Sequence, residues 1–374
     1  MKRVLITGGA GFIGSHLVDR LLQAGHEVRI LDSLEAQVHG ASQNPPPYLN
    51  PGAEFIRGDV CDRAAVDRAI QGVEVVFHQA AAVGVAQSMY EMDRYVRSNS
   101  LGTAMLLRAL LDRKSRVEKL VVASSMSIYG EGEFRCENHG AVAITERPVE
   151  QLQQRRWEPE CPACRTPLQP APTRERKLLY PTSVYALTKK DQEEMALIFG
   201  RSYGIPVVAL RYFNVFGSRQ AVSNPYTGVA AIFAARLLNR HRPLIFEDGG
   251  QLRDFVHVSD VARANILAME HPEADGKAVN IGAGRSISVL QIARELAKLL
   301  GREDIEPEIP GAFRKGDTRH CFGDITLART WLGYEPLCSF TDGMRETVEW
   351  MRNEKAEDRV DQSLRELKAR GLTE

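Results

Sequence analysis

Residues 4–18, VLITGGAGFIGSHLV, decide the fold of this 374-residue chain. VLIT is apolar or β-branched throughout, which predicts a buried strand. Gly8, Gly11 and Gly14 follow at a regular spacing of three, and the residues after them have the apolar periodicity of a helix that ends near Gly25. A strand, a glycine-rich turn and a helix in this order predict the first unit of a parallel α/β sheet.

Further strand candidates recur along the chain, and helical patterns separate most of them. These candidates are residues 28–32, 54–59, 73–78, 119–125 and 206–213. Because apolar strands that alternate with helices form parallel sheets covered on both faces, we expect a doubly wound, Rossmann-like α/β fold.

The glycine-rich turn also predicts a dinucleotide site. Glycines allow the backbone to approach a pyrophosphate closely, and the helix N-terminus at Phe12–Gly14, which includes Ile13, supplies oriented N–H groups. Asp32 ends the second predicted strand, where a carboxylate accepts hydrogen bonds from a ribose 2′-hydroxyl and repels a 2′-phosphate. The pattern therefore favours NAD over NADP. The alternative is a glycine turn with an incidental aspartate.

Composition excludes several classes of partner. Lys and Arg number 48 and Asp and Glu number 48, so no net charge favours nucleic acid or an anionic membrane. Six cysteines are too few for a disulfide scaffold. Glycines interrupt the apolar N-terminus, which argues against a signal peptide, and no apolar run is long enough to span a membrane. We therefore expect a cytoplasmic enzyme.

A candidate catalytic pair lies in SVYALTKK (183–190). Tyr185 and Lys189 are four residues apart on a predicted helix and share one face. A lysine ammonium beside a tyrosine is expected to lower the pKa of the phenol. Ser125 ends a predicted strand at the carboxyl edge of the sheet, where ligands bind in this fold. Taken alone, the Tyr–Lys pair is more typical of an ordinary helix surface than of a catalytic site.

Nine short motifs follow one another in order: TGGAGFIG (7–14), GDV (58–60), HQAA (78–81), NSLGT (99–103), SSMSIYG (124–130), YALTK (185–189), RYFNVFG (211–217), RDFVHVSD (253–260) and RKGD (314–317). Together they resemble the extended short-chain dehydrogenase/reductase family, and within it the nucleotide-sugar epimerases and dehydratases. The resemblance covers nearly the whole chain outside residues 131–178 and the C-terminal tail.

The resemblance implies roles for individual residues. Tyr185 would take a proton from a sugar hydroxyl, Lys189 would hold the nicotinamide ribose, and Ser125 would be the catalytic serine. The further cofactor contacts implied are Asp59 and Val60 at the adenine, Ala80 and Ala81 in HQAA, and Asn99 near the phosphates. Asn214, Arg253 and Arg314 would hold the nucleotide diphosphate of the substrate, a task that suits the arginine fork.

The reaction implied is 4-epimerisation by transient oxidation at C4. The dehydratase and decarboxylase branches place carboxylates just after the catalytic serine or threonine, whereas Met126, Ser127 and Ile128 follow Ser125. The subgroup that the chain resembles most contains dTDP-L-rhamnose 4-epimerases, on the long insertion and the loop 223–233. Alternatives are a UDP-glucose 4-epimerase, a nucleotide-sugar dehydratase or reductase, and an NAD-binding regulatory protein.

Residues 131–178 lack periodicity and predict an insertion that contains two ligand pairs. Cys136 and His139 form the first pair, and Cys161 and Cys164 form the second. Their spacing predicts a structural Cys₃His zinc site, although a redox pair and unbound thiols stay open. We hypothesise a zinc-held flap over the sugar pocket. Basic residues of the insertion leave a nucleic-acid-binding zinc ribbon as a third class of function.

The expected organisation is an NAD-binding domain over residues 1–215, interrupted by the insertion, and a nucleotide-sugar-binding lobe over 216–353. Within that lobe, 255–280 should return to the NAD-binding domain, and 354–374 read as a charged tail. By resemblance, the helices that carry NSLGT and YALTK should pack against a second subunit, giving a homodimer.

Overall fold

The seven strands of the main sheet are all parallel in the computed structural model, which describes residues 1–42, 44–112, 117–221, 224, 226, 228–354, 358 and 360–373. Their order is β13-β9-β5-β4-β1-β2-β3. The strands are β1 (Arg3–Thr7), β2 (Glu27–Asp32), β3 (Glu54–Arg57), β4 (Val75–His78), β5 (Lys119–Ser125), β9 (Val207–Tyr212) and β13 (Lys277–Ile281). The doubly wound fold predicted from the sequence is confirmed.

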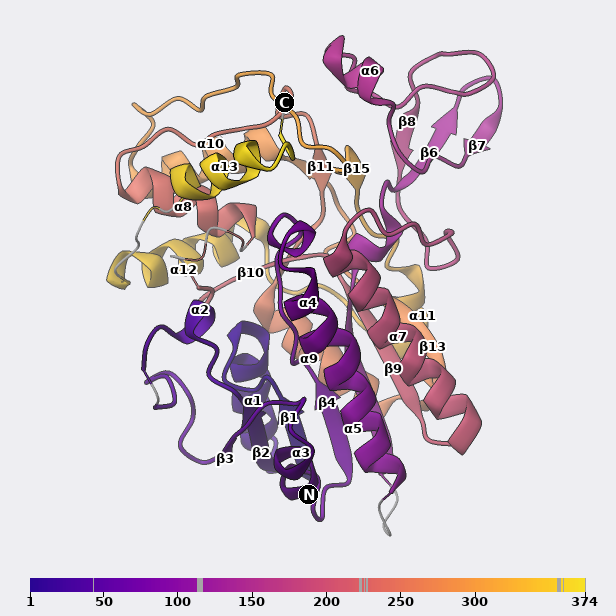
Figure 1. The fold of residues 1–374 in the computed structure, drawn as a ribbon, viewed down its shortest axis with the longest axis vertical. Coiled ribbons are helices and arrows are strands. Elements are labelled where there is room, and N and C mark those ends of the chain that lie inside the picture. Colours follow the sequence, from indigo (N-terminus) through magenta and orange to yellow (C-terminus); the bar gives the residue numbers. More distant parts are fainter. Residues whose placement is uncertain are drawn as a thin grey trace.

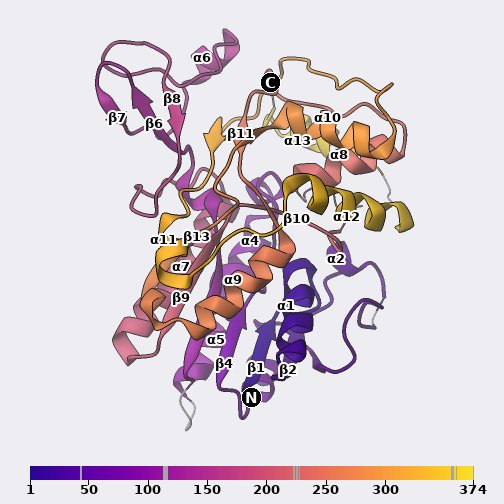
Figure 2. The same ribbon diagram turned by 180° about the vertical axis from the view of Figure 1, so that it is seen from behind.

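Helices cover both faces of this sheet. On one face lie α1 (Phe12–Gln23), α9 (Val258–Glu270) and α11 (Thr326–Leu332), seen from behind in Figure 2. On the other lie α3 (Arg63–Ala69), α5 (Gly102–Leu111) and α7 (Val184–Tyr203), at the front of Figure 1. Val4 and Ile6 of β1 pack into the first core and Leu5 into the second, because successive strand residues point to opposite faces.

A smaller lobe with its own core stands above the carboxyl edge of the sheet (Figure 1). It contains α8 (Val229–Leu238), α10 (Val289–Leu300), α12 (Phe340–Asn353) and α13 (Val360–Ala369), the strands β11 (Leu252–Arg253), β14 (Ile287–Ser288) and β15 (His320–Cys321), and the pair β10 (Asn214–Phe216) and β12 (Phe255–His257). Within the predicted charged tail, Val360–Ala369 form a helix that is packed through Val360, Ser363 and Leu367.

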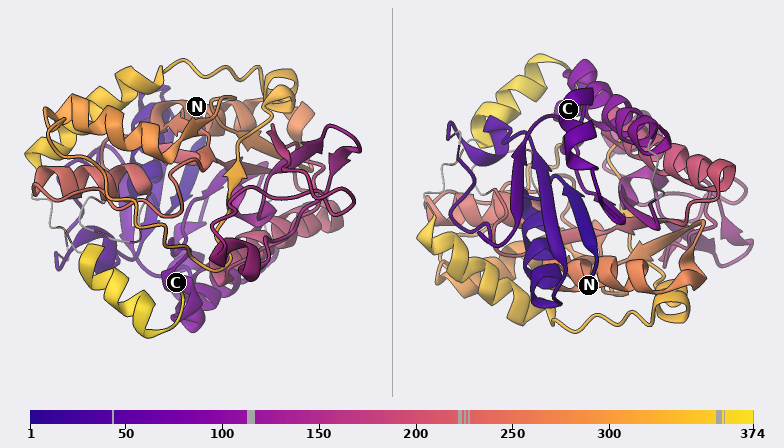
Figure 3. Two further views of the ribbon diagram at one scale, coloured as in Figure 1. Left: turned by 90° about the horizontal axis from the view of Figure 1, so that it is seen from above. Right: turned by 90° about the horizontal axis from the view of Figure 1, so that it is seen from below.

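Residues 131–178 form a structured insertion and not only an irregular loop. Its sheet has the strand order β7 (Gly140–Val142), β6 (Glu133–Cys136), β8 (Gln169–Ala171). The insertion also contains the short helix α6 (Val149–Gln153). It projects from one upper corner of the molecule beside β15, as the view from above also shows (Figure 3).

The remaining elements are short. They are α2 (Ala36–His39), η1 (Gln87–Met89), α4 (Met92–Tyr95), the π-helical turn η2 (Val96–Leu101), η3 (Met126–Tyr129) and η4 (Pro272–Ala274). None of the helices in the described ranges is both long and apolar enough to cross a bilayer.

Candidate active site

The glycine-rich turn between β1 and α1 is packed so closely that side chains are excluded. Gly8 has a φ of 71°, and a Cβ there would lie 2.8 Å from Ala80 Cα. A Cβ on Gly14 would lie 2.3 Å from the carbonyl oxygen of Gly8. Gly11 caps α1, whose first N–H groups have no partner within the helix. The turn thus forms a cradle for an anionic group at a helix N-terminus.

Asp32 lies beside this cradle at the end of β2 and is 8% exposed. Its carboxylate accepts hydrogen bonds from the backbone N–H groups of Ala10 (3.0 Å) and Leu34 (2.9 Å). These bonds fix the carboxylate and leave acceptor capacity for a ribose hydroxyl. Cradle and carboxylate together fit an NAD molecule, as the sequence predicted.

The other residues of the glycine-rich turn and of GDV serve packing as well. Phe12 packs edge-on to His16, with ring centroids 6.2 Å apart, and Ile13 packs against the core. Asp59 is exposed, whereas Val60 is buried against α5. A Cβ on Gly102 would lie 2.6 Å from Val60 Cγ2, which explains the glycine in NSLGT.

Asn99 is buried in the π-helical turn η2 and ties two parts of the site together. Its Oδ1 accepts from Ala82 N (2.7 Å), and its Nδ2 donates to Thr188 Oγ1 (3.0 Å). Asn99 therefore holds the loop that contains Ala80 and Ala81 against α7. A local break in α-helical geometry is common at functional sites.

Ser125 and Tyr185 come together where β5 ends and α7 begins. Ser183 caps α7 by accepting from Ala186 N (3.1 Å), which places Tyr185 in the first turn. The Ser125 hydroxyl lies close enough to the Tyr185 phenol to lower the pKa of that phenol. Ser127 Oγ donates to Ser125 Oγ (2.9 Å) and fixes the serine.

The electrostatics of the pair differ from the sequence expectation. Burial raises the pKa of Tyr185, and the nearby hydroxyl of Ser125 opposes this shift. Lys189 does not lower it, since its ammonium donates to Ala123 O and to Gln192 Oε1 (2.7 Å). Burial lowers the pKa of Lys189 to about 7, with Glu193 acting in the opposite direction. The predicted lowering of the phenol pKa was wrong, because spacing along a helix does not reveal desolvation.

The predicted diphosphate-binding residues lie in the lobe above the sheet. Arg253 is in β11 and donates to the carbonyl oxygens of Thr318 (2.5 Å) and Arg319 (3.0 Å). Arg314 stacks on Phe246, with its guanidinium carbon 4.1 Å from the ring centroid. Two buried atoms of this group have no partner within the described residues, namely Asn214 Oδ1 and Arg314 Nε. Unpaired polar atoms of this kind suit a polar ligand.

Comparison with known proteins decides the family. The NAD dependent epimerase/dehydratase family matches residues 4–151 and 161–282. The chain belongs to this family. A dTDP-L-rhamnose 4-epimerase of Burkholderia thailandensis is 33% identical over 356 residues, which cover 94% of this chain and 96% of that protein.

Solved structures of epimerases share the fold. The UDP-glucose 4-epimerase of Thermotoga maritima with UDP-glucose has a TM-score of 0.74 and 34% identity, covering 94% of this chain and 98% of that chain. The Thermus thermophilus UDP-glucose 4-epimerase in complex with NAD has a TM-score of 0.71 and 31% identity, covering 94% and 99%. The epimerase is thus an NAD-binding isomerase of the nucleotide-sugar 4-epimerase type.

Two buried groups of the epimerase escaped sequence reasoning, although both lie in matching motifs. The imidazole of His78 in HQAA forms one hydrogen bond to the hydroxyl of Thr7 (2.7 Å) and one to the hydroxyl of Thr103 (2.8 Å). Asp254 follows Arg253 and accepts hydrogen bonds from the N–H groups of Ala283 (2.7 Å), Gly284 (3.0 Å) and Gly323 (3.3 Å). Burial raises the pKa of Asp254 to about 7.

The insertion of the epimerase joins the lobe through buried ion pairs that no local pattern predicts. Glu131 accepts from Arg147 Nε (3.1 Å) and from Arg319 N (2.9 Å). Arg147 and Arg319 both pair with Glu247, at 2.8 and 2.9 Å. These contacts fix the insertion to the segment after Arg314.

The predicted metal ligands are brought together, all four within 4.8 Å of one another. They lie in the insertion and not at the Ser125–Tyr185 pair. The hypothesis that the insertion is a flap over the sugar pocket stays a prediction.

Proposed function

We propose that this protein is an NAD-dependent 4-epimerase of dTDP-L-rhamnose, which it interconverts with dTDP-6-deoxy-L-talose. The observation that carries the proposal is the Ser125–Tyr185 pair at the carboxyl edge of the sheet, the same edge that holds the glycine cradle and Asp32. Enzyme families that place a hydroxyl pair and a dinucleotide site at one edge transfer hydride to and from a carbinol.

The protein residues supply orientation and proton transfer. Bound NAD would supply the hydride acceptor and donor for the oxidation and reduction at sugar C4. Tyr185 takes the proton of the 4-hydroxyl and gives it back, and Ser125 shares a hydrogen bond with the same oxygen. Lys189 holds the cofactor ribose. Between the two hydride transfers the 4-keto sugar would rotate in the pocket and present the other face of C4. The 4-hydroxyl would then form with the opposite configuration.

The absence of a further acid or base at Ser125 supports epimerisation over dehydration. Residues 126–128 carry no carboxylate. The next carboxylate along the chain is Glu131, which is engaged by Arg147 and by backbone N–H groups of 319 and 320. Elimination of water needs a free acid and base at C5 and C6, and this element offers none.

The substrate handle is a nucleotide diphosphate. Asn214, Arg253 and Arg314 offer an amide and two guanidinium groups in one lobe, and the unpaired Asn214 Oδ1 and Arg314 Nε support a polar ligand there. The rhamnose derivative is favoured by the dTDP-L-rhamnose 4-epimerase relative, which matches 94% of this chain. The loop 223–233 was a second reason, but residues 223, 225 and 227 lie outside the described residues.

UDP-glucose is the second candidate, because a solved UDP-glucose 4-epimerase is 34% identical to this chain and covers 94% of it. One experiment separates the two. Purified protein, without added NAD, is incubated in D₂O with each nucleotide sugar and followed by proton NMR. We expect the C4 epimer of dTDP-L-rhamnose without solvent deuterium. Deuterium at C3 or C5 would contradict direct hydride return, and turnover of UDP-glucose alone would reassign the sugar.

The proposal includes a homodimer formed by the α5–α7 surface. The helical run of α4, η2 and α5 lies beside α7 (Figure 1). Exposed apolar side chains on these elements, called the apolar stripe, are Met92 of α4, Val96 and Leu101 of η2, and Leu187, Ile198 and Tyr203 of α7. Exposed apolar side chains on neighbouring helices support a subunit interface there. The structural zinc ion expected from the sequence takes no part in the hydride chemistry, because its candidate ligands lie in the insertion.

A further inference from the structure

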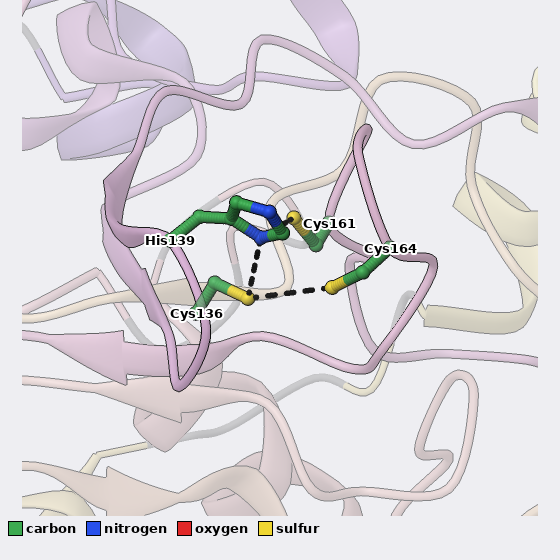
Figure 4. Close-up of side chains that lie close together, drawn as sticks. All are labelled: Cys136, His139, Cys161 and Cys164. Atoms are coloured by element: carbon green, nitrogen blue, oxygen red, sulfur yellow. Dashed lines mark hydrogen bonds between the residues drawn. The ribbon is translucent and has the colours of Figure 1, made fainter.

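The tip of the insertion gathers four side chains from two tight turns (Figure 4). Cys136 ends β6, and His139 lies in the turn before β7. Cys161 and Cys164 lie in a second turn, closed by the bridge between Glu160 and Pro167. Other residues of the insertion separate the two turns along the chain, yet their sulfur and nitrogen atoms face a common centre.

The distances between these atoms match the edges of a metal tetrahedron. Bond lengths of about 2.3 Å to sulfur and about 2.1 Å to nitrogen give S···S edges of about 3.8 Å and S···N edges of about 3.6 Å. The Cys136 and Cys164 sulfurs are 3.6 Å apart. His139 Nδ1 is 3.5 Å from the sulfur of Cys136 and 3.5 Å from that of Cys161.

The same distances argue against a disulfide. A disulfide bond is about 2.05 Å long, far shorter than the separation of Cys136 and Cys164, and all six cysteines are free. Nor are these three thiols dispersed as ordinary small apolar residues would be. Thr166 Oγ1 lies 2.7 Å from the Cys164 sulfur and Asn138 Nδ2 lies 3.8 Å from it, the kind of outer-shell donors that orient thiolate ligands.

The insertion has too small a core to hold this geometry by packing alone. Within the described residues its buried apolar side chains are Phe134, Cys136, Leu152, Cys161 and Leu168, and two of these five are candidate ligands. Small modules with so little apolar burial depend on a metal or a covalent crosslink. Arg165 adds a cost, since its φ of 63° is unfavourable for a residue with a side chain.

We propose that Cys136, His139, Cys161 and Cys164 bind one structural Zn²⁺ ion that fastens the two turns of the insertion together. All four tetrahedral positions are filled by protein atoms, so the ion has no open position for a substrate or a reactive water. Its role is to fix β6, and through Glu131 the segment that follows Arg314. This site stands apart from the hydride chemistry and does not depend on the identity of the sugar.

The direct test is the metal content of the purified protein, measured by inductively coupled plasma mass spectrometry after growth with zinc. We expect about one zinc per chain in the wild type. Cys164→Ser and His139→Ala should lower the ratio at least tenfold, whereas Cys338→Ser, which removes a thiol outside the cluster, should keep it. Wild-type protein that carries no zinc and takes none up on dialysis would overturn the proposal.

A second measurement keeps the test valid where a variant fails to fold. Zinc in the wild-type protein is replaced by Co²⁺, and the absorption spectrum is recorded. Tetrahedral thiolate coordination gives intense visible bands and a near-ultraviolet thiolate-to-cobalt band, which we expect. A weak spectrum typical of six oxygen ligands would contradict the site. So would an intact mass two hydrogens lower under native conditions, because it would show that two of the thiols form a disulfide.

Discussion

At the scale of single residues, the site depends on side chains whose charge is set by burial. Tyr185 sits next to Ser125 with a raised pKa, and Lys189 behind it has a pKa lowered to about 7. His78 is buried between two hydroxyls. Burial makes each of these groups costly to ionise, so each stays uncharged over a wider pH range than it would in water.

Tyr185→Phe removes the hydroxyl that moves the proton and leaves the ring in its packing against Tyr95. We expect kcat to fall by about 10²- to 10⁴-fold, with little change in thermal stability. The measurement is the NMR epimerisation rate together with a melting curve. Tyr203→Phe, at the exposed end of the same helix, is the matched control. Full activity in Tyr185→Phe would remove the tyrosine from the reaction.

His78 makes the protein sensitive to acid. Burial, with a smaller contribution from Lys189, lowers the pKa of His78 to about 3. The unfolded chain therefore binds a proton near pH 6.5 that the folded chain does not bind until about pH 3, so stability falls as pH falls through this window. We expect the His78→Gln protein to be less stable than the wild type at pH 7.5. The slope of its free energy of unfolding against pH should be smaller by up to about 1.4 kcal/mol per pH unit.

The measurement is the free energy of unfolding by urea between pH 7.5 and 5. His271→Gln, at a position whose side chain is 42% exposed, is the control and should follow the wild type. His16 also has a lowered pKa but is present in every variant, so the difference between slopes isolates His78. Equal slopes in the wild type and His78→Gln would contradict the assignment.

At the scale of elements, the sequence predicted the sheet well and the contacts between elements poorly. The strands around Val4–Thr7 and 119–125 could be predicted because apolar patterning is local. The cradle and the Ser125–Tyr185 pair could be inferred for a related reason, since strand ends and helix starts meet at one edge of a parallel sheet. The Glu131–Arg147–Glu247 pairs could not, because their partners are distant in sequence.

Gly14 and Gly11 separate the two roles of the glycine-rich turn. Gly14→Ala places a Cβ against backbone on both sides, so we expect loss of stability and of NAD binding. A Cβ on Gly11 meets only one atom, Gly8 O at 3.3 Å, so Gly11→Ala should fold and yet bind NAD at least tenfold more weakly. Calorimetric titration with NAD, alongside melting curves, checks both. Unchanged affinity in Gly11→Ala would place the pyrophosphate elsewhere.

Glu131→Gln tests the link between the insertion and the lobe. Glu131 is 2% exposed. A neutral amide in its place removes a negative charge that pairs with the buried guanidinium of Arg147. We expect the free energy of unfolding to fall by about 3 kcal/mol. The KM for the nucleotide sugar should rise more than kcat falls, because Arg253 is held by the carbonyl groups of 318 and 319.

The control for this variant is Glu133→Gln, whose ion pair with Arg174 is partly exposed and should cost under about 1 kcal/mol. Stability comes from urea unfolding and the kinetic constants from initial rates. A KM that stays at the wild-type value in a folded Glu131→Gln protein would show that the insertion does not position the substrate lobe.

At the scale of the whole molecule, the described residues form three large apolar cores beside smaller clusters. Two of the large cores lie on the faces of the main sheet, and the third fills the lobe. The candidate site lies between them, at the edge where β5 and α7 meet β10 and β11. The C-terminal helix α13 closes one side of the lobe, and Glu366 on it accepts hydrogen bonds from Tyr90 (3.2 Å) and Tyr226 (3.0 Å).

Assembly can be tested on the apolar stripe of α4, η2 and α7. Ile198→Glu adds a charge to a side chain that is 53% exposed in the single chain. We expect a homodimer in the wild type and a monomer in this variant, measured by light scattering after size-exclusion chromatography. Leu337→Glu, at a position 74% exposed in the other lobe, should stay dimeric. A monomeric wild type would contradict the proposed interface.

The order of the strands has a consequence for synthesis on the ribosome. β13 is built from residues 277–281 and completes the sheet by pairing with β9, and Asn280 on it donates to the carbonyl groups of Thr173 and Asp324. Until that strand emerges, the nascent chain carries six strands and an open edge at β9. Open edges recruit strands from neighbouring chains. Polypeptides that end before residue 277 should therefore aggregate in the cell. Full-length chains should need protection by chaperones until late in translation.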